Sequence, residues 1–338
     1  MSYPNHLTAQ WHIIDRCNFR CRHCYQAEFQ NKGFDFSGLK QIADQVFDLH
    51  HQLKADQKHF PLHFTLTGGE PLTHADFAPL LRYLGDNPAT SGIGVLSNGS
   101  LIDSQWVNCF RASKIRFVQL SVEGVEQTHD AIRGKNSFKQ VIESSQLLNK
   151  ANIRVIWSFT AHQQNFREFA DVAKLAHRYK ISRLWSDRMI PSAQDDELNT
   201  LTADETTEYI QLMSRARQQV HKKFRNRTEI ALARALQFQA GHSTPYKCQA
   251  GGGLITIMPD GTLYPCRRMP INVGNIMDTP LAELYHAPLM QQLRDFEYPQ
   301  ACSICLYKNL CKGGLRCLAY ALTDSGFNRD PGCQALEF

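Results

Sequence analysis

Three cysteines near the N-terminus stand close enough in the sequence to bind one metal centre. They are Cys17, Cys21 and Cys24, with the spacing CxxxCxxC. Three thiolates are one ligand fewer than a saturated 4Fe–4S cluster takes, so one iron would stay open to another molecule. A zinc site is the alternative, and it requires a fourth ligand. His23 is the nearest candidate, although its place between two ligands makes chelation awkward.

A second group of cysteines lies in the last third of the chain. Of the 11 cysteines, the seven in this group are Cys248, Cys266, Cys302, Cys305, Cys311, Cys317 and Cys333. Such clustering without a secretory signal favours metal binding over disulfides. Two zinc ribbons are the alternative, although seven cysteines do not divide into two four-cysteine sites. Cys109 stands alone in a predicted helix, as a small buried apolar residue or, alternatively, a hydrogen-atom donor.

Polar turns follow several of the predicted strands. The first is Thr67-Gly68-Gly69-Glu70-Pro71, whose glycines permit close backbone approach and whose glutamate would accept a hydrogen bond from a cationic amine. Ser97-Asn98-Gly99 follows the next strand; the strand after it carries Ser121 near its end and is followed by Arg133. Because active sites of parallel barrels gather at the carboxyl ends of strands, these side chains are expected to share one site.

Short apolar runs alternate with amphipathic segments along the first two thirds of the chain. The strand-like runs are Trp11–Ile14, His63–Leu66, Ile93–Leu96, Phe117–Val122, Val155–Phe159 and Ile181–Trp185. The first helical segment places Leu39, Ile42, Ala43, Val46 and Phe47 on one face. Six strand–helix units predict an α/β fold with parallel strands, closed as a partial (β/α)6 barrel. An open doubly wound sheet is the alternative.

The alternation of apolar runs and amphipathic segments ends after about residue 228. Leu254–Met258, the turn Pro259-Asp260-Gly261 and Thr262-Leu263-Tyr264 predict a small hairpin, followed by cysteine-rich loops that need metal to hold their shape. We therefore expect a barrel domain over 7–227 and an iron–sulfur domain over 228–338.

Composition indicates a globular protein of the cytoplasm. Of 338 residues, 43% are hydrophobic and 20% charged, with a net charge of +5. No signal peptide or apolar run of about 20 residues is evident, so no membrane partner is expected. One basic run, 221–227, is interpreted as a solvated helix end, with docking of an acidic peptide or nucleic acid as the alternative; a nucleic-acid partner is not expected.

Taken in order, the cysteine triad and the polar turns resemble the radical S-adenosylmethionine (radical SAM) superfamily. The resemblance implies that Cys17, Cys21 and Cys24 hold a [4Fe–4S] cluster to which SAM binds. His23, at a position usually aromatic, would lie near the adenine. Gly68, Gly69, Glu70 and Asn98 would belong to the SAM site, with Ser121 and Arg133 at the methionine carboxylate. Glu123 stands where relatives often have aspartate.

The seven later cysteines resemble the SPASM domain, which implies two auxiliary iron–sulfur clusters. Cys302, Cys305, Cys311 and Cys333 would ligate the distal one fully. Cys248, Cys266 and Cys317 would hold the other, with one position open or filled by another ligand. Between Cys311 and Cys317 this chain has two more residues than the common CxxxC.

The resemblance implies an enzyme that cleaves SAM to a 5′-deoxyadenosyl radical, with a flavodoxin- or ferredoxin-like one-electron reductant as partner. The cluster-bound SAM carries the chemistry, and no other catalytic residue is predicted. The main hypothesis is modification of a ribosomally made peptide or protein side chain by crosslink, thioether, epimerisation or oxidation, with a separate peptide-recognition protein. A small-molecule substrate (porphyrin, sugar or nucleoside derivative) and a non-catalytic iron–sulfur electron carrier are the alternatives.

Overall fold

The chain forms two compact units. A computed structural model describes residues 4–26, 28–55, 57–191, 198–221, 228–240 and 245–334. The first unit comprises 4–18, 28–118 and 249–295, and the second comprises 19–26, 119–248 and 296–334. Most of the basic run, 222–227, lies outside the described residues. None of the described helices is long and apolar enough to cross a membrane.

The first unit is built on a sheet of strand order β10-β9-β8-β1-β2-β3. β1 is parallel to both β8 and β2, and Leu7 pairs with Leu62. β8 and β9 form the expected hairpin. The strands are β1 (Leu7–His12), β2 (Leu62–Thr67), β3 (Thr90–Ser97), β8 (Leu254–Ile257), β9 (Thr262–Tyr264) and β10 (Gly274–Asn275). β4 (Ile115–Ser121) begins in this unit and ends in the second.

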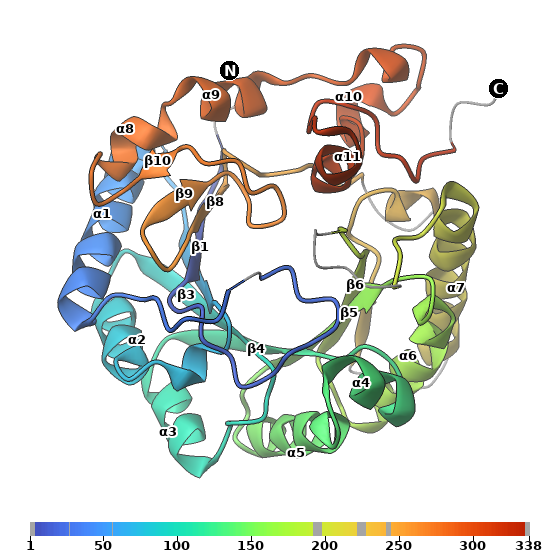
Figure 1. Cartoon of the computed structure of the whole chain (residues 1–338), viewed down its shortest axis with the longest axis horizontal. Coiled ribbons are helices and arrows are strands. Elements are labelled where there is room, and N and C mark those ends of the chain that lie inside the picture. The colour runs from blue at the N-terminus through green and yellow to red at the C-terminus, as the bar shows by residue number, and fades with distance from the viewer. Residues whose placement is uncertain are drawn as a thin grey trace. The chain divides into compact units, whose positions relative to one another are not determined.

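Helices of the first unit follow its strands. They are α1 (Phe36–Lys54), η1 (Pro71–Thr73), α2 (Phe77–Asp86), α3 (Ser104–Ala112), α8 (Leu281–Tyr285) and α9 (Pro288–Asp295). α1 buries Leu39, Ile42, Ala43 and Val46, as its periodicity predicts, whereas Phe47 is only half-buried. α1 and α8 lie side by side, joined by the Gln45 side chain, which binds Leu281 N and Ile276 O at 2.8 Å each (Figure 1).

The second unit repeats the strand–helix alternation. β5 (Val155–Ala161), β6 (Arg183–Arg188) and β7 (Glu229–Ala231) run parallel. The accompanying helices are α4 (Glu126–Arg133), α5 (Ser137–Lys150), η2 (Phe166–Glu168), α6 (Phe169–Arg178) and α7 (Ala203–His221), with α6 and α7 side by side (Figure 1). The end of the chain adds only short helices: η3 (Gln237–Ala240), η4 (Gln300–Cys302), α10 (Lys308–Cys311) and α11 (Arg316–Thr323).

Helices cover one face of β5 and β6. Trp157 Nε1 donates to Ser145 Oγ of α5 at 3.0 Å, and the Tyr209 hydroxyl of α7 donates to Ser186 of β6. Because strand residues alternate between faces, Trp185 and Asp187 point to the opposite face of β6. That face is therefore free of these helices.

One local expectation needs correction. The first strand runs over Leu7–His12 rather than 11–14, because its pairing with β2 begins at Leu7. α5 begins at Ser137 and is preceded by Asn136 at the cap position, whose side chain makes no capping bond. By contrast, Thr202 and Glu205 exchange the reciprocal bonds of a capping box, at 3.2 and 2.9 Å, before α7.

A buried ion pair connects β6 to the end of the chain. Both guanidinium nitrogens of Arg188 donate to the Asp330 carboxylate, at 2.8 and 2.6 Å. The side chains are 4% and 0% exposed. A pair this deeply buried gains little net stability against water, but losing one partner leaves an uncompensated charge.

Asp330→Asn should therefore destabilise the second unit strongly. The change preserves side-chain size and removes the carboxylate that pairs with both guanidinium nitrogens of buried Arg188; breaking such a pair typically costs about 3–5 kcal/mol. Anaerobic denaturant unfolding of the reconstituted protein, followed by tryptophan fluorescence, measures the change in the free energy of unfolding.

Arg167→Met is the matched control. Arg167 makes an equally bidentate pair with Glu208, but the two side chains are 63% and 44% exposed. Its loss should change the free energy of unfolding far less than Asp330→Asn does, because water screens an exposed pair. Equal effects of the two changes would show that burial of the Arg188–Asp330 pair does not matter.

Candidate active site and iron–sulfur cluster sites

The turn after β2 packs directly against the segment that leads to Cys17. Gly69 N donates to Ile14 O at 2.8 Å, and Glu70 N donates to Arg16 O at 2.9 Å. A Cβ on Gly68, whose φ is +148°, or on Gly69 would stand 2.2 Å from a backbone oxygen of this segment. The two glycines are therefore required by close backbone approach, and their hydrogen bonds fix the residues before the first cysteine.

The Glu70 carboxylate is fully buried and organises the end of β3. Its Oε1 accepts from Ser97 Oγ at 2.9 Å and from Leu72 N at 3.2 Å, and its Oε2 accepts from Asn98 N at 2.8 Å. The Asn98 side-chain amide donates in turn to Cys17 Sγ at 3.9 Å. An N–H directed at sulfur favours the thiolate that an iron ligand must be.

In the second unit the loop of Cys21 and Cys24 is attached to α4. Arg22 N donates to Ile132 O at 3.0 Å, and Cys24 N donates to Cys21 O at 3.0 Å. Arg133 donates through one terminal nitrogen to Cys21 Sγ at 3.7 Å. Burial raises the pKa of the Cys21 thiol, and Arg133 opposes that rise. An approaching iron therefore meets a thiol whose thiolate a cation already stabilises.

Glu123 is the centre of this second set of contacts. Its side chain is 1% exposed, and its Oε1 accepts from Arg133 at 2.6 and 3.1 Å and bonds His23 Nε2 at 3.2 Å. Thr160 N donates to the other oxygen at 3.0 Å. Burial raises the pKa of Glu123, but His23 and Arg133 outweigh it and hold the pKa well below its usual range. The carboxylate is therefore ionised and orients both partners.

Two further residues expected to bind SAM, His23 and Ser121, belong to the second unit. Ser121 is the last residue of β4. The other ring nitrogen of His23, Nδ1, is buried and has no hydrogen-bond partner among the described residues. A buried polar atom without a partner fits a site that a bound cofactor completes. The roles of His23, Gly68, Gly69, Glu70, Asn98, Ser121 and Arg133 in binding SAM remain predictions.

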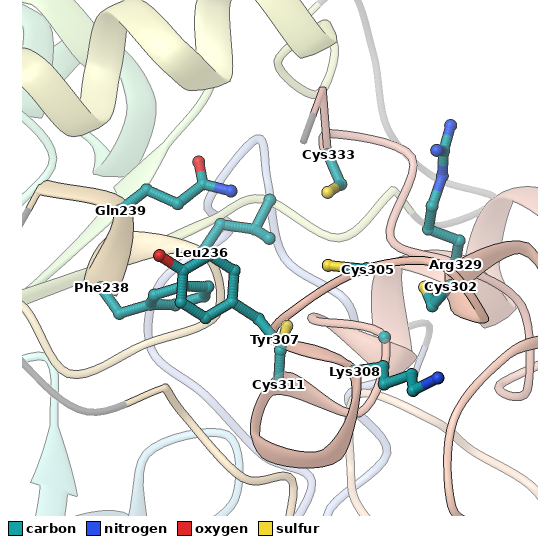
Figure 2. A pocket seen from close by; sticks show the side chains of 11 residues that line it. Leu236, Phe238, Gln239, Cys302, Cys305, Tyr307, Lys308, Cys311, Arg329 and Cys333 are labelled. Carbon is teal, nitrogen blue, oxygen red and sulfur yellow. The ribbon is translucent and has the colours of Figure 1, made fainter. Parts of the chain in front are cut away.

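Four cysteines expected at one auxiliary cluster line a single pocket. Figure 2 shows Cys302, Cys305, Cys311 and Cys333 around it, with Leu236, Phe238, Gln239, Tyr307, Lys308 and Arg329 completing the wall. Four thiols in one partly apolar pocket fit the ligand set of a saturated cluster. Burial raises the pKa of Cys311 to about 12, so binding of iron there must displace a proton.

Asp330 ties the loops of these cysteines together, a role that sequence reasoning missed. Besides Arg188, its carboxylate accepts from Leu315 N at 2.8 Å and Gly332 N at 2.9 Å. The extra residues after Cys311 make this possible. Gly313 and Gly314 have φ of +89° and +82°, and a Cβ on Gly314 would stand 2.6 Å from Asp330. The only sequence signal was Asp330-Pro-Gly-Cys333.

The remaining cysteines divide between the units. Cys266 follows β9 in the first unit, whereas Cys248 and Cys317 belong to the second. Binding of a second auxiliary cluster by these three cysteines remains a prediction. Binding of one cluster by Cys17, Cys21 and Cys24 together also remains a prediction. Cys109 on α3 is half-buried rather than fully buried, and burial raises the pKa of its thiol.

A cation held between aromatic rings lies on the helix-free face of β6. The guanidinium carbon of Arg234 is 5.3 Å from the ring centre of Trp185 and 4.5 Å from that of Tyr246. Its Nε donates to Asp187 at 2.9 Å, and 27% of the side chain is exposed. Sequence reasoning missed this group because no motif marks it.

Comparison with known proteins gives the same assignment for both parts of the chain. The radical SAM superfamily model matches residues 11–188, and the SPASM model, an iron-sulfur cluster-binding domain, matches 248–306. The AdoMet-dependent heme synthase of Methanosarcina barkeri is 24% identical over 343 residues, covering 96% of this chain and 95% of the relative. The antilisterial bacteriocin subtilosin biosynthesis protein AlbA of Bacillus subtilis is 24% identical, covering 98% of this chain and 71% of the relative.

The fold is also that of a solved structure. anSMEcpe with bound AdoMet and Cp18Cys peptide superposes with a TM-score of 0.76 at 21% identity, covering 98% of this chain and 94% of the other. The likeness confirms the expected α/β fold, and the two family models confirm that this fold is a radical SAM domain with a C-terminal iron–sulfur domain. The chain therefore belongs to the radical SAM superfamily, as an enzyme with a SAM-binding [4Fe–4S] cluster and an auxiliary iron–sulfur SPASM domain.

Proposed function

We propose that this enzyme uses a 5′-deoxyadenosyl radical to modify a planar, carboxylate-bearing tetrapyrrole. The observation that carries the proposal is Arg234, a partly exposed cation bordered by the rings of Trp185 and Tyr246. A guanidinium offers paired donors to a carboxylate, and aromatic rings offer flat apolar surface to a macrocycle. The full-length similarity to a heme synthase supports this reading.

The residues around the N-terminal triad have separate tasks in this proposal. When bound, the reduced cluster and SAM supply the radical that abstracts a hydrogen atom from the substrate. Glu70 would receive the methionine amino group and Arg133 its carboxylate. Glu123 holds Arg133 and His23 in place. The protein thus positions the reacting groups, while the cofactors carry the chemistry.

Modification of a peptide side chain is the second candidate. The similarity to a subtilosin biosynthesis protein and the fold of anSMEcpe, solved with a peptide, favour it. In that case a separate recognition protein would bring the peptide. The tetrapyrrole candidate requires Arg234 to bind a carboxylate of the substrate, whereas the peptide candidate does not. Substitution of Arg234 therefore distinguishes the two candidates.

The substrate class can be tested with iron-coproporphyrin III, a porphyrin with four propionates. Anaerobically reconstituted enzyme with SAM and dithionite should form 5′-deoxyadenosine faster when the porphyrin is added, with a change in porphyrin mass. Arg234→Gln should raise the apparent KM by roughly ten- to hundredfold, since a hydrogen bond to a charged group contributes about 1.5–3 kcal/mol. Arg234→Lys should recover part of the loss.

Two controls show that the stimulation depends on the SAM-binding cluster and on the porphyrin carboxylates. Cys24→Ala should form no 5′-deoxyadenosine, and the porphyrin tetramethyl ester should not stimulate the native enzyme. Intact SAM cleavage that iron-coproporphyrin III neither accelerates nor couples to a product would exclude this tetrapyrrole and favour the peptide candidate.

Loss of Arg133 should weaken SAM binding while leaving the iron content intact. Arg133→Ala removes the proposed charge-assisted contact with the methionine carboxylate of SAM, so the Kd of SAM should rise roughly ten- to hundredfold. Arg20→Ala, which changes an exposed arginine in the same cysteine loop, is the control. Equilibrium binding to fully reconstituted protein measures both. If Arg133→Ala binds SAM as tightly as Arg20→Ala does, Arg133 does not contact SAM.

The auxiliary clusters predict a defined metal content. Three [4Fe–4S] clusters correspond to about twelve irons per chain, and Cys305→Ala should remove about four of them. Cys109→Ala should remove none, because that cysteine stands alone in the sequence, on α3, and belongs to neither cysteine group. Metal analysis of anaerobically purified protein decides this, and stoichiometric zinc would contradict the cluster assignment.

A further inference from the structure

Gln119 contacts the aromatic cation site that carries the proposed function. It belongs to β4, and its Oε1 accepts a hydrogen bond from Trp185 Nε1 at 3.0 Å. Arg234 lies against the same indole, with its guanidinium carbon 5.3 Å from the ring centre. All three residues belong to the second unit. Trp185 therefore joins a neutral amide on β4 to the cation that is proposed to bind the substrate.

The bond to Trp185 fixes which end of the Gln119 amide is available. An indole N–H can only donate, so the amide oxygen faces it and the NH2 group is turned away from it. The NH2 group has no hydrogen-bond partner among the described residues. The Gln119 side chain is only half-buried, so water can solvate this group when no substrate is bound. Its N–H donors are thus available to an oxygen of a bound molecule.

Gln119 and Trp185 lie close to the expected SAM site. Ser158 of β5 pairs with Trp185 and accepts a hydrogen bond from Val122 N at 2.9 Å, so Trp185 lies level with the end of β4. Ser121, expected at the methionine carboxylate of SAM, is the last residue of that strand. Gln119 stands two residues before it on the same face, about 6.6 Å along the strand. A molecule that Gln119 binds would therefore lie next to SAM, as the substrate of a SAM-derived radical must.

We infer that Gln119 is a second substrate-binding residue, whose amide N–H groups donate to a carboxylate oxygen of the tetrapyrrole. Arg234 supplies the charge that attracts such a substrate, and Gln119 adds a neutral donor whose orientation the indole sets. A hydrogen bond to an ionised oxygen is stronger than one between neutral groups, so this donor favours the free acid. The inference rests on the proposed function, because it takes the substrate to be a carboxylate-bearing tetrapyrrole.

The test measures the Kd of iron-coproporphyrin III from its absorbance, with fully reconstituted enzyme. Gln119→Leu removes the donor, so the Kd should rise roughly ten- to hundredfold. Gln119→Glu keeps the shape and still accepts the Trp185 N–H, but it places an anion where the donor was, so it should weaken binding further. Gln211→Glu makes the same charge change at an exposed position of α7, the helix that covers the other face of β6. This matched control should bind the porphyrin as tightly as the native enzyme.

The porphyrin tetramethyl ester separates a contact with the substrate from structural damage. The ester has no charge for an anion to repel, so Gln119→Glu should weaken binding of the free acid far more than binding of the ester. Unchanged iron content verifies that the variant is folded. An equal loss for acid and ester would overturn the inference, because it would indicate a purely structural role of Gln119.

Trp185→Phe tests whether the indole N–H orients the amide. Phenylalanine keeps an aromatic ring but has no N–H, so the Gln119 amide is free to turn. Gln119→Leu should then raise the Kd by a smaller factor in the Trp185→Phe background than in the native background. The same factor in both backgrounds would show that Trp185 does not orient the donor, and the inference would fail at that step.

The results also distinguish this inference from the proposed function. If Arg234→Gln weakens binding of iron-coproporphyrin III while both Gln119 variants bind it like the native enzyme, the inference is wrong and the proposed function stands. If the native enzyme does not bind the porphyrin at all, both are wrong.

Discussion

The buried carboxylate of Asp330 is the interaction on which the cysteine-rich end of the chain depends. It accepts four hydrogen bonds, two from Arg188 on β6 and two from backbone N–H groups beside the cysteines. The segment after residue 296 has only short helices and little apolar core of its own. A buried anion whose hydrogen bonds are satisfied on both oxygens anchors this segment to β6.

The buried carboxylate of Glu123 anchors the N-terminal cysteine loop in the same way. Glu123 pairs with Arg133, which also contacts Cys21, and bonds His23 from the same loop. Burying an ionised carboxylate or a guanidinium alone costs much desolvation free energy. In the pair, each group satisfies the hydrogen bonds of the other, and both are held in one orientation. In the first unit the turn Gly68-Gly69-Glu70 holds the chain before Cys17 by backbone hydrogen bonds. Rigid attachment of ligand loops is what positions an iron–sulfur cluster for chemistry.

The two faces of β6 differ in what they contact. Ser186 faces α7, whereas Trp185 and Asp187 face away from the helices and surround Arg234. A partly exposed cation between rings adds little to a core but offers charge and flat surface to a substrate. In the segment that lines the four-cysteine pocket, Ile304, Leu306 and Leu310 expose apolar side chains, which is the usual mark of an interaction site.

The sequence by itself determined the cofactor chemistry and the repeating architecture. Spacing predicts which cysteines share a centre, apolar periodicity finds α1, a turn signal finds the β8–β9 hairpin, and Gly68-Gly69 marks a close backbone approach. These signals are local, because each reflects neighbours within one turn, strand or loop. Only the tertiary structure decided which charged side chains pair. Arg188 and Asp330 are 142 residues apart, and no sequence feature near either residue predicts its partner. The same holds for Arg234 with Trp185 and Tyr246. A buried charge takes the partner that the packed chain brings within hydrogen-bond distance, and that choice depends on the whole fold.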